Sequence, residues 1–244
     1  MKFFLFSAFP REVGEVVRST GRGEKMRGLP FKAFCVRLSS HVLFVAETGL
    51  GVENAGKVFR RLLQSERPDA VVSLGYCGAL TDETSVGDVI WASSVCLIDG
   101  QRVERLSLPD GTELLEALSL RVPLKSGTFL TMKEWRKKGE LLPLVDPAMA
   151  LPVCDMETFA IARLCRDHKL PFYGLRAVSD PAGKELGFDP GSVCDAEGTY
   201  RVWLALKLFL TRPRLLAQAM ELRRTSNIAS RSLGRAVAAL LDML

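Results

Sequence analysis

The chain has 244 residues, of which 48% are hydrophobic, and a formal net charge of +5. This length and apolar content suffice for one buried core, and the distribution of turn and linker residues does not require a second domain. No stretch approaches the roughly 20 uninterrupted apolar residues that span a bilayer, which argues against a membrane-spanning helix. The six cysteines contain no Cys-x-x-Cys pair, which argues against a zinc site or a disulfide framework and favours reduced thiols in a cytoplasmic protein.

Strand-like apolar segments recur along the chain and alternate with helical patterns, which predicts a mixed α/β fold. The predicted strands are Lys2–Ser7, Phe31–Leu38, His41–Glu47, Ala70–Gly75, Asp88–Ile98, Val122–Leu130, Ala150–Cys154 and Phe172–Val178. From Val52 to Ser65 the apolar residues recur at helical spacing, which predicts a surface helix with one side against the core.

The segment from Ala150 to Val178 has the pattern of a β-α-β unit. A crossover helix connects parallel strands, so we expect Glu157 and Asp180 to follow the carboxyl ends of two parallel strands. Open α/β sheets bind ligands at that edge. The two acids are therefore predicted to share one cleft.

The last part of the chain is predicted to be helical and is strongly basic. A Gly- and Pro-rich loop follows Asp180 and is long enough to act as a lid. Beyond it, Asp195 to Leu244 is expected to be helical, with interruptions at Pro213 and near Thr225, where a new helix would begin. Residues 200–244 carry eight basic and two acidic side chains. No nucleic-acid motif accompanies them, so an anionic membrane or plain solvent is the expected neighbour of this surface.

Each acid also has an ordinary structural explanation when taken alone. Glu157 would stand in the first turn of a helix, where the helix dipole favours an acid. Asp180 precedes Pro181, and Asp-Pro is common in turns. Glu12 is equally compatible with a first-turn position. Only the ordered set of motifs points to a function.

That ordered set resembles the purine nucleoside phosphorylase and nucleosidase superfamily, most closely its methylthioadenosine/adenosylhomocysteine nucleosidase branch. The motifs are Ser7-Ala8 with Glu12, Thr48-Gly49-Leu50-Gly51 with Asn54-Ala55, Gly75-x-Cys77-Gly78-Ala79-Leu80, Val86-Gly87-Asp88-Val89, Ser126-Gly127-x-Phe129, Asp155-Met156-Glu157 and Arg176-x-x-Ser179-Asp180. The resemblance implies a single-domain, three-layer αβα fold with a mixed central sheet. We expect residues 1–192 to form this core and residues 193–244 to form a C-terminal helical extension of the same domain.

The resemblance also implies cleavage of an N-ribosidic bond without metal or organic cofactor. Asp180 matches the general acid that protonates the departing base, and Ser179 and Arg176 would orient it. We expect burial to raise the pKa of Asp180. Glu12 matches the group that takes a proton from the attacking water.

The remaining matched positions are implied to bind substrate. Glu157 matches the acceptor of the ribose 2′ and 3′ hydroxyl hydrogens, and Met156 would pack beneath the sugar. The backbone around Phe129 and Leu130 would meet the edge of the base. Gly75 and Tyr76 would border the ribose or nucleophile pocket.

The sequence leaves two candidates for the nucleophile, water and phosphate. The related phosphorylases place an Arg at the start of the strand that corresponds to Ala70–Gly75 and a hydroxyl shortly after Leu74; the matching positions here are Ser73 and Tyr76. Together with Glu12, this favours water. Tyr76 also departs from the small residue usual in the nucleosidases, which leaves the substrate open.

The basic C-terminal extension resembles that of hopanoid-associated relatives, which implies a lipid-linked adenosine as substrate and peripheral membrane contact. A solvated face of packing helices is the plainer alternative. The expected protein is thus a nucleosidase that assembles as a homo-oligomer. A phosphate-dependent phosphorylase and an inactive nucleoside-binding module are the alternatives.

Overall fold

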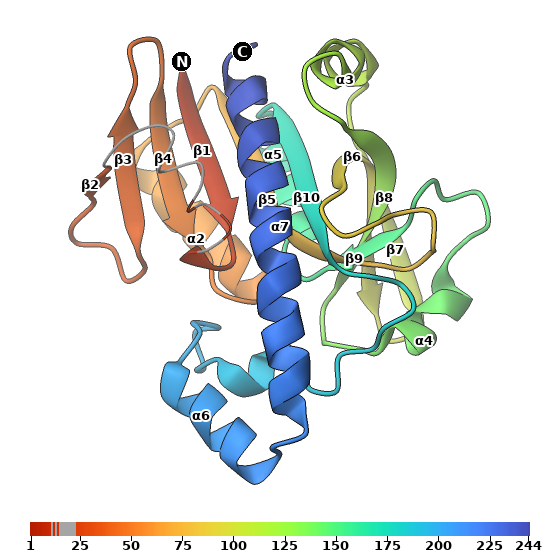
Figure 1. The fold of residues 1–244 in the computed structure, drawn as a ribbon. Helices are drawn as coiled ribbons and strands as arrows, with labels where there is room; N and C mark the ends of the chain where they lie inside the picture. Colours follow the sequence, from red (N-terminus) through yellow and green to blue (C-terminus); the bar gives the residue numbers. More distant parts are fainter. Residues whose placement is uncertain (11, 13, 15–22) are drawn as a thin grey trace.

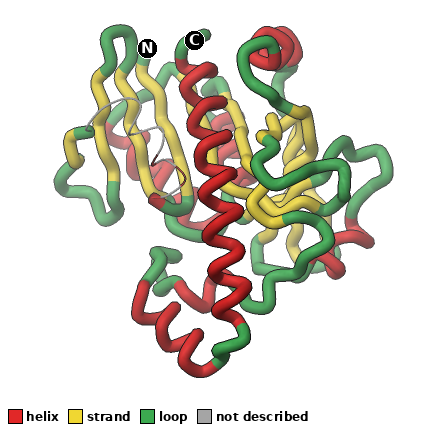
Figure 2. The backbone as a smooth tube through the Cα atoms, in the orientation of Figure 1, coloured by secondary structure: helices red, strands yellow, loops and turns green. Residues whose placement is uncertain are grey.

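The computed structural model describes residues 1–10, 12, 14 and 23–244. Figure 1 shows a large twisted sheet with helices on both faces, and Figure 2 shows the same arrangement by element type. The strands are β1 (Lys2–Ser7), β2 (Glu24–Lys25), β3 (Ala33–Arg37), β4 (Val42–Glu47), β5 (Ala70–Ala79), β6 (Val89–Asp99), β7 (Arg102–Ser107), β8 (Lys125–Met132), β9 (Val153–Asp155) and β10 (Phe172–Asp180). The helices are α2 (Val52–Ser65), α3 (Thr112–Ser119), α4 (Lys138–Leu141), α5 (Thr158–Asp167), α6 (Val202–Thr211) and α7 (Leu215–Leu241), with short 3-10 turns η1 (Leu142–Leu144) and η2 (Pro190–Val193).

The strand pairings close a ring of five strands. β5 pairs with β10, β10 with β6, β6 with β8, β8 with β9, and β9 again with β5. On the side away from β10, β5 also pairs with β1, from which β4, β3 and β2 extend the sheet. Both parallel and antiparallel pairings occur, so the predicted α/β fold with a mixed central sheet is confirmed.

Alternation along β1 explains why helices cover both faces. Phe3 and Leu5 belong to the apolar cluster that includes α7, whereas Phe4 and Phe6 belong to the cluster that includes α2 and α5. Successive side chains of a strand point to opposite faces, so a strand of apolar residues alone must be covered on both. The predicted strand Lys2–Ser7 and the predicted helix Val52–Ser65 both have the bounds expected.

The prediction that the strands around Glu157 and Asp180 are parallel is wrong. β10 runs parallel to β5, whereas β9 runs antiparallel to β5, so β9 and β10 point in opposite directions. The two segments nevertheless meet, because Cys154 of β9 and Asp180 of β10 both pair with Gly78 of β5. The segments that carry Glu157 and Asp180 are therefore brought together by their pairing with the end of β5, and not by a parallel β-α-β unit.

The predicted helix break near Thr225 is also wrong, because α7 runs unbroken from Leu215 to Leu241. The Thr225 hydroxyl donates to the Leu222 carbonyl within the helix instead of capping a new one. The predicted interruption at Pro213 is confirmed, since it lies between α6 and α7. The C-terminal half of α7 packs on the sheet through Leu233 and Val237, while Figure 1 shows its N-terminal half extending beyond the sheet beside α6. Among the helices of the described residues, none is long and apolar enough to cross a membrane.

Candidate active site

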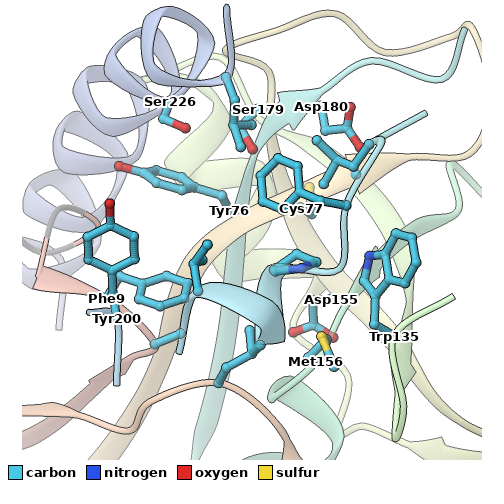
Figure 3. Close-up of a pocket in the computed structure, with 18 of the residues that line it drawn as sticks. Phe9, Tyr76, Cys77, Trp135, Asp155, Met156, Ser179, Asp180, Tyr200 and Ser226 are labelled. Carbon is cyan, nitrogen blue, oxygen red and sulfur yellow. The ribbon is translucent and has the colours of Figure 1, made fainter. Parts of the chain in front are cut away.

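A cavity of about 720 Å³ lies at the ends of β5 and β10. This volume falls within the usual range for small-molecule sites. Figure 3 shows side chains from β5, from the segment after β9 and from the end of β10 around it. Of the residues predicted to form the site, those that line the cavity are Glu12, Tyr76, Met156, Glu157, Ser179 and Asp180.

Glu12 is held over the backbone of β5. Its carboxylate accepts hydrogen bonds from the amides of Phe9 (3.0 Å) and Tyr76 (3.1 Å). A Cβ at Gly75 would lie only 2.9 Å from Glu12 Oε1, and glycine is the residue without a Cβ. Gly75 therefore contributes to the site by making room for the carboxylate. Burial raises the pKa of Glu12, and the hydrogen bonds and Arg176 act against this.

Glu157 stands immediately before α5, at the N-terminal end of that helix. Its Oε1 accepts a hydrogen bond from the Gly51 amide at 2.9 Å, which ties it to the turn that precedes α2. Burial, and then the neighbouring Asp155, raise the pKa of Glu157 to about 8. Burial thus favours the protonated form of this carboxyl in the ligand-free protein.

Arg176 does not orient Asp180, contrary to the sequence-based expectation. Its guanidinium is buried and binds Asp155 Oδ2 through Nε (3.1 Å) and Nη2 (2.8 Å), and Nη2 also donates to the Ser73 hydroxyl. Asp155 further accepts hydrogen bonds from the Thr158 amide and hydroxyl. Arg176 is absent from the cavity lining among the described residues and instead fixes the strand-to-helix turn that carries Glu157.

Asp180 has a partner that the sequence analysis did not identify. Lys138 Nζ lies 2.8 Å from Asp180 Oδ2, and both side chains are largely buried, at 7% and 14% exposure. Burial raises the pKa of Asp180, while the Lys138 ammonium opposes this. Lys138 follows two other basic residues, a pattern typical of a solvated surface, so no signal in the sequence pointed to its burial.

Phe129 and Leu130 do not reach the cavity. Both side chains are fully buried within β8, in two separate apolar clusters. From the same strand only Met132 is part of the cavity lining. In the loop after β8, Trp135 also lines the cavity (Figure 3).

The part of the cavity away from the carboxylates is largely apolar. Its walls come from the loop before η2 and from η2, α6 and α7, and they include Phe188, Val193, Ala205, Phe209 and Leu222, with Arg223 and Ser226 of α7 as polar members. Most of these side chains also form a separate small core between the α6 segment and the start of α7. The C-terminal helices are therefore part of the site, whereas the sequence analysis treated them only as an outer surface.

Comparison with known proteins identifies the family. The sequence matches the phosphorylase superfamily over residues 2–199. The chain belongs to the phosphorylase superfamily. It is similar to the 5′-methylthioadenosine/S-adenosylhomocysteine nucleosidase of Shewanella piezotolerans, with 26% identity over 213 residues that cover 78% of this chain and 90% of that protein.

Solved structures agree with this assignment at the level of the fold. The 5′-methylthioadenosine/S-adenosylhomocysteine nucleosidase of Helicobacter pylori superposes with a TM-score of 0.76 at 12% identity, covering 100% of this chain and 99% of that one. The futalosine hydrolase of the same organism gives a TM-score of 0.75 at 13% identity, covering 100% and 98%. The predicted membership of this superfamily, as an enzyme of the nucleosidase or nucleoside phosphorylase class, is confirmed.

Proposed function

We propose that the protein hydrolyses the N-ribosidic bond of a purine nucleoside that carries an apolar 5′ substituent, and that adenine is the base released. The observation that carries the proposal is that Glu12, Glu157 and Asp180 line one cavity. The relatives named above are nucleosidases or a hydrolase of the same fold, which supports the reaction class.

The three carboxyl groups suit three different tasks in this reaction. As the bond breaks, negative charge builds on the base and positive charge on the ribose. Asp180, with its pKa raised by burial, is suited to donate a proton to the base. Glu12 is suited to accept a proton from the attacking water. Glu157 is suited to bind the ribose hydroxyls, because hydroxyl donors and a cationic sugar both favour its carboxylate form.

Water is the proposed nucleophile because Glu12 already accepts the hydrogen bonds of backbone amides that a phosphate would need. A phosphate site needs free backbone amides or a well-placed arginine. Here the Phe9 and Tyr76 amides donate to Glu12, and the Arg176 guanidinium is paired with Asp155. A phosphate at this point would also lie among the acidic side chains of Glu12 and Glu157.

The apolar part of the cavity supports a hydrophobic 5′ substituent. With the base at Asp180 and the ribose at Glu157, the 5′ side of the nucleoside is left to face the walls from η2, α6 and α7. Those walls would exclude water from an alkyl or lipid chain, and Arg223 of α7 is the charged residue that they contribute to the cavity lining among the described residues. A lipid-linked adenosine is therefore the proposed substrate class.

The outer surface of the same helices supports the proposal of peripheral membrane contact. Val202, Trp203, Leu206 and Leu210 of α6 are all more than half exposed. Leu216 and Met220 of α7 are also at least half exposed and at the same time line the cavity, so the mouth opens onto this apolar surface. Exposed basic residues flank it at Lys207, Arg212 and Arg214. Apolar side chains rimmed by cations suit an anionic membrane.

The test is to measure base release from adenosine, methylthioadenosine, adenosylhomocysteine and a 5′-alkylated adenosine, each with and without phosphate. We expect free adenine and free sugar without phosphate, with the highest kcat/KM for the 5′-alkylated compound. Asp180→Asn should bind nucleoside and lose at least about 10²-fold in turnover. Release only with phosphate, with a sugar phosphate as product, would identify a phosphorylase. Binding without any release would identify an inactive module.

Two expectations stay predictions. The homo-oligomer can be tested by light scattering coupled to gel filtration. The division at residue 192 can be tested by truncation, and we expect removal of residues 193–244 to destabilise the core, because α7 covers one face of the sheet.

A further inference from the structure

Lys138 holds the end of β10 through a complete set of hydrogen bonds. Its Nζ lies 2.8 Å from Asp180 Oδ2, 3.1 Å from the Asp180 carbonyl and 2.5 Å from the Pro181 carbonyl. A lysine ammonium has three N–H donors, and here each can meet one acceptor. The side chain is buried, and these three acceptors replace the water that burial removes from its donors.

The backbone on either side of this contact is also fixed. The amides of Lys138 (3.1 Å) and Gly139 (2.9 Å) donate to the carboxylate of Glu185. Lys138 thus binds the loop after β10, and Glu185 of that loop binds the start of α4. The two segments are joined in both directions beside the cavity, which both Lys138 and Glu185 line.

Gly78 provides the space for the Lys138–Asp180 pair. A Cβ at this position would lie 3.1 Å from Lys138 Cε and 3.3 Å from Asp180 Oδ2. Cys154 Sγ is equally close to the same point, at 3.0 Å. The ionisable groups that face Asp180 are therefore Lys138 from α4, Glu185 from the loop and Cys154 from β9. Of these, only Lys138 is a cation.

We propose that Lys138 is a positioning residue for the general acid: it binds Oδ2 of Asp180 and leaves Oδ1 to carry the proton toward the departing base. This rests on the proposed function. In the reaction the Oδ1 proton forms an N–H bond on the base, and the electron pair of the C–N bond goes to the base. Water then bonds to the anomeric carbon and loses a proton to Glu12. Exchange with solvent returns a proton to Asp180 and removes one from Glu12.

The pH dependence of turnover distinguishes a positioning role of Lys138 from a merely structural one. Asp180 acts in its protonated form, so kcat falls as the pH rises through its pKa. A neighbouring ammonium favours the carboxylate and lowers that pKa, and removing it must move the fall to higher pH. Loss of a merely structural contact would reduce kcat without changing the pH at which kcat declines.

The experiment compares Lys138→Met and Lys138→Gln, which remove the charge, with Lys138→Arg, which retains it. We expect the two uncharged variants to lose about tenfold or more in kcat with KM changed less than about threefold, and the alkaline limb of kcat to move up by about one pH unit or more. Lys138→Arg should keep the wild-type limb. The matched control is Lys184→Met, which removes an exposed lysine that pairs with Glu221. An unmoved limb in folded Lys138→Met or Lys138→Gln would overturn the inference.

A second measurement needs no turnover. The titration midpoint of the Asp180 carboxyl carbon, assigned by NMR through its loss in Asp180→Asn, should rise in Lys138→Met and not in Lys184→Met. If wild-type protein released no base but the midpoint rose, the proposed function would fail and the coupling between Lys138 and Asp180 would stand. An unchanged midpoint would refute the coupling itself.

Discussion

The carboxylate of Glu12 lies against the backbone of Gly75, at a distance that leaves no room for a side chain on the glycine. Gly75 belongs to β5, the strand that pairs with both β1 and β10. The central strand of the sheet thus supports an acid from a segment more than 60 residues earlier in the sequence. The contact makes position 75 sensitive to the smallest substitution.

Gly75→Ala should displace Glu12 and lower turnover by at least tenfold. The added methyl group would stand 2.9 Å from Glu12 Oε1 and 3.2 Å from its carboxyl carbon, so the carboxylate must move. Overpacking of this kind typically costs about 1–3 kcal/mol of stability. The measurements are steady-state base release and chemical unfolding. The control is Gly183→Ala, where a Cβ would meet nothing within 4 Å. Unchanged turnover in Gly75→Ala would show that Glu12 is not required where it lies.

Glu157→Gln should stabilise the protein above neutral pH. The pKa of Glu157 is about 8 in the folded state, against an ordinary value of 4.5. Between these values the folded protein binds a proton that the unfolded chain has lost, so the free energy of unfolding falls as the pH rises. The destabilisation is absent below about pH 4.5, complete above about pH 8, and removed by the neutral glutamine.

Thermal unfolding at pH 5 and pH 8 tests this. The gain of Glu157→Gln should be larger at pH 8, on the order of 1–3 kcal/mol, which is typical of site residues that trade stability for function. Glutamine retains an oxygen for the Gly51 amide, so the change isolates the charge. Glu116→Gln, on the exposed side of α3, is the control. Equal gains at both pH values would contradict the assignment of a retained proton to Glu157.

Asp155→Ala should be the most destabilising change near the site. It would leave the Arg176 guanidinium buried at 2% exposure without its carboxylate partner. Removing one member of a buried ion pair costs about 3–5 kcal/mol. Urea unfolding measures this loss, and Lys133→Ala, which breaks an exposed pair with Asp99, should leave the midpoint nearly unchanged. A similar small effect for both would mean that the buried pair does not fix the turn before α5.

Trp203→Glu combined with Leu210→Glu should reduce binding to vesicles that contain anionic phospholipid by at least fivefold. Both side chains are exposed on α6, and neither lines the cavity, so base release from a water-soluble nucleoside should be retained. Cosedimentation measures the bound fraction. Leu120→Glu is the control, because Leu120 is 90% exposed but lies beside α3, on the opposite side of the molecule from α6 (Figure 1). Absence of vesicle binding by the wild-type protein would refute the proposed membrane contact.

Much of the fold and the acidic residues of the site could be predicted because they depend on local patterns. The apolar alternation of Lys2–Ser7 and the helical spacing of Val52–Ser65 are strong signals that packing does not override. The sequence predicts that Glu157 and Asp180 share one cleft, and both line the same cavity. The reason offered was wrong, since the direction of the three-residue strand β9 depends on its pairing with β5 and not on the helix that follows it.

The partners of the acids could not be predicted, because they depend on tertiary packing. Arg176 and Asp180 are close in sequence, yet the register of β10 shifts between Val178 and Asp180, and the arginine pairs with Asp155. Lys138 lies in a basic stretch that indicates solvent exposure, and only the fold brings it to the end of β10. The apolar residues of α6 carry no sign in the sequence that some face a cavity and others face outward.

The residues proposed for catalysis lie on or against the closed ring of five strands, whereas the residues proposed to select the substrate lie outside it. Each strand in the ring pairs with at least two others, so none can slide along them without moving the rest. Asp180 ends one of these strands and the carboxylate of Glu12 lies against another, whereas the walls contributed by α6 and the start of α7 lie outside the ring. Sequence drift in those helices could therefore retune the preferred nucleoside over evolutionary time and leave the reaction itself intact.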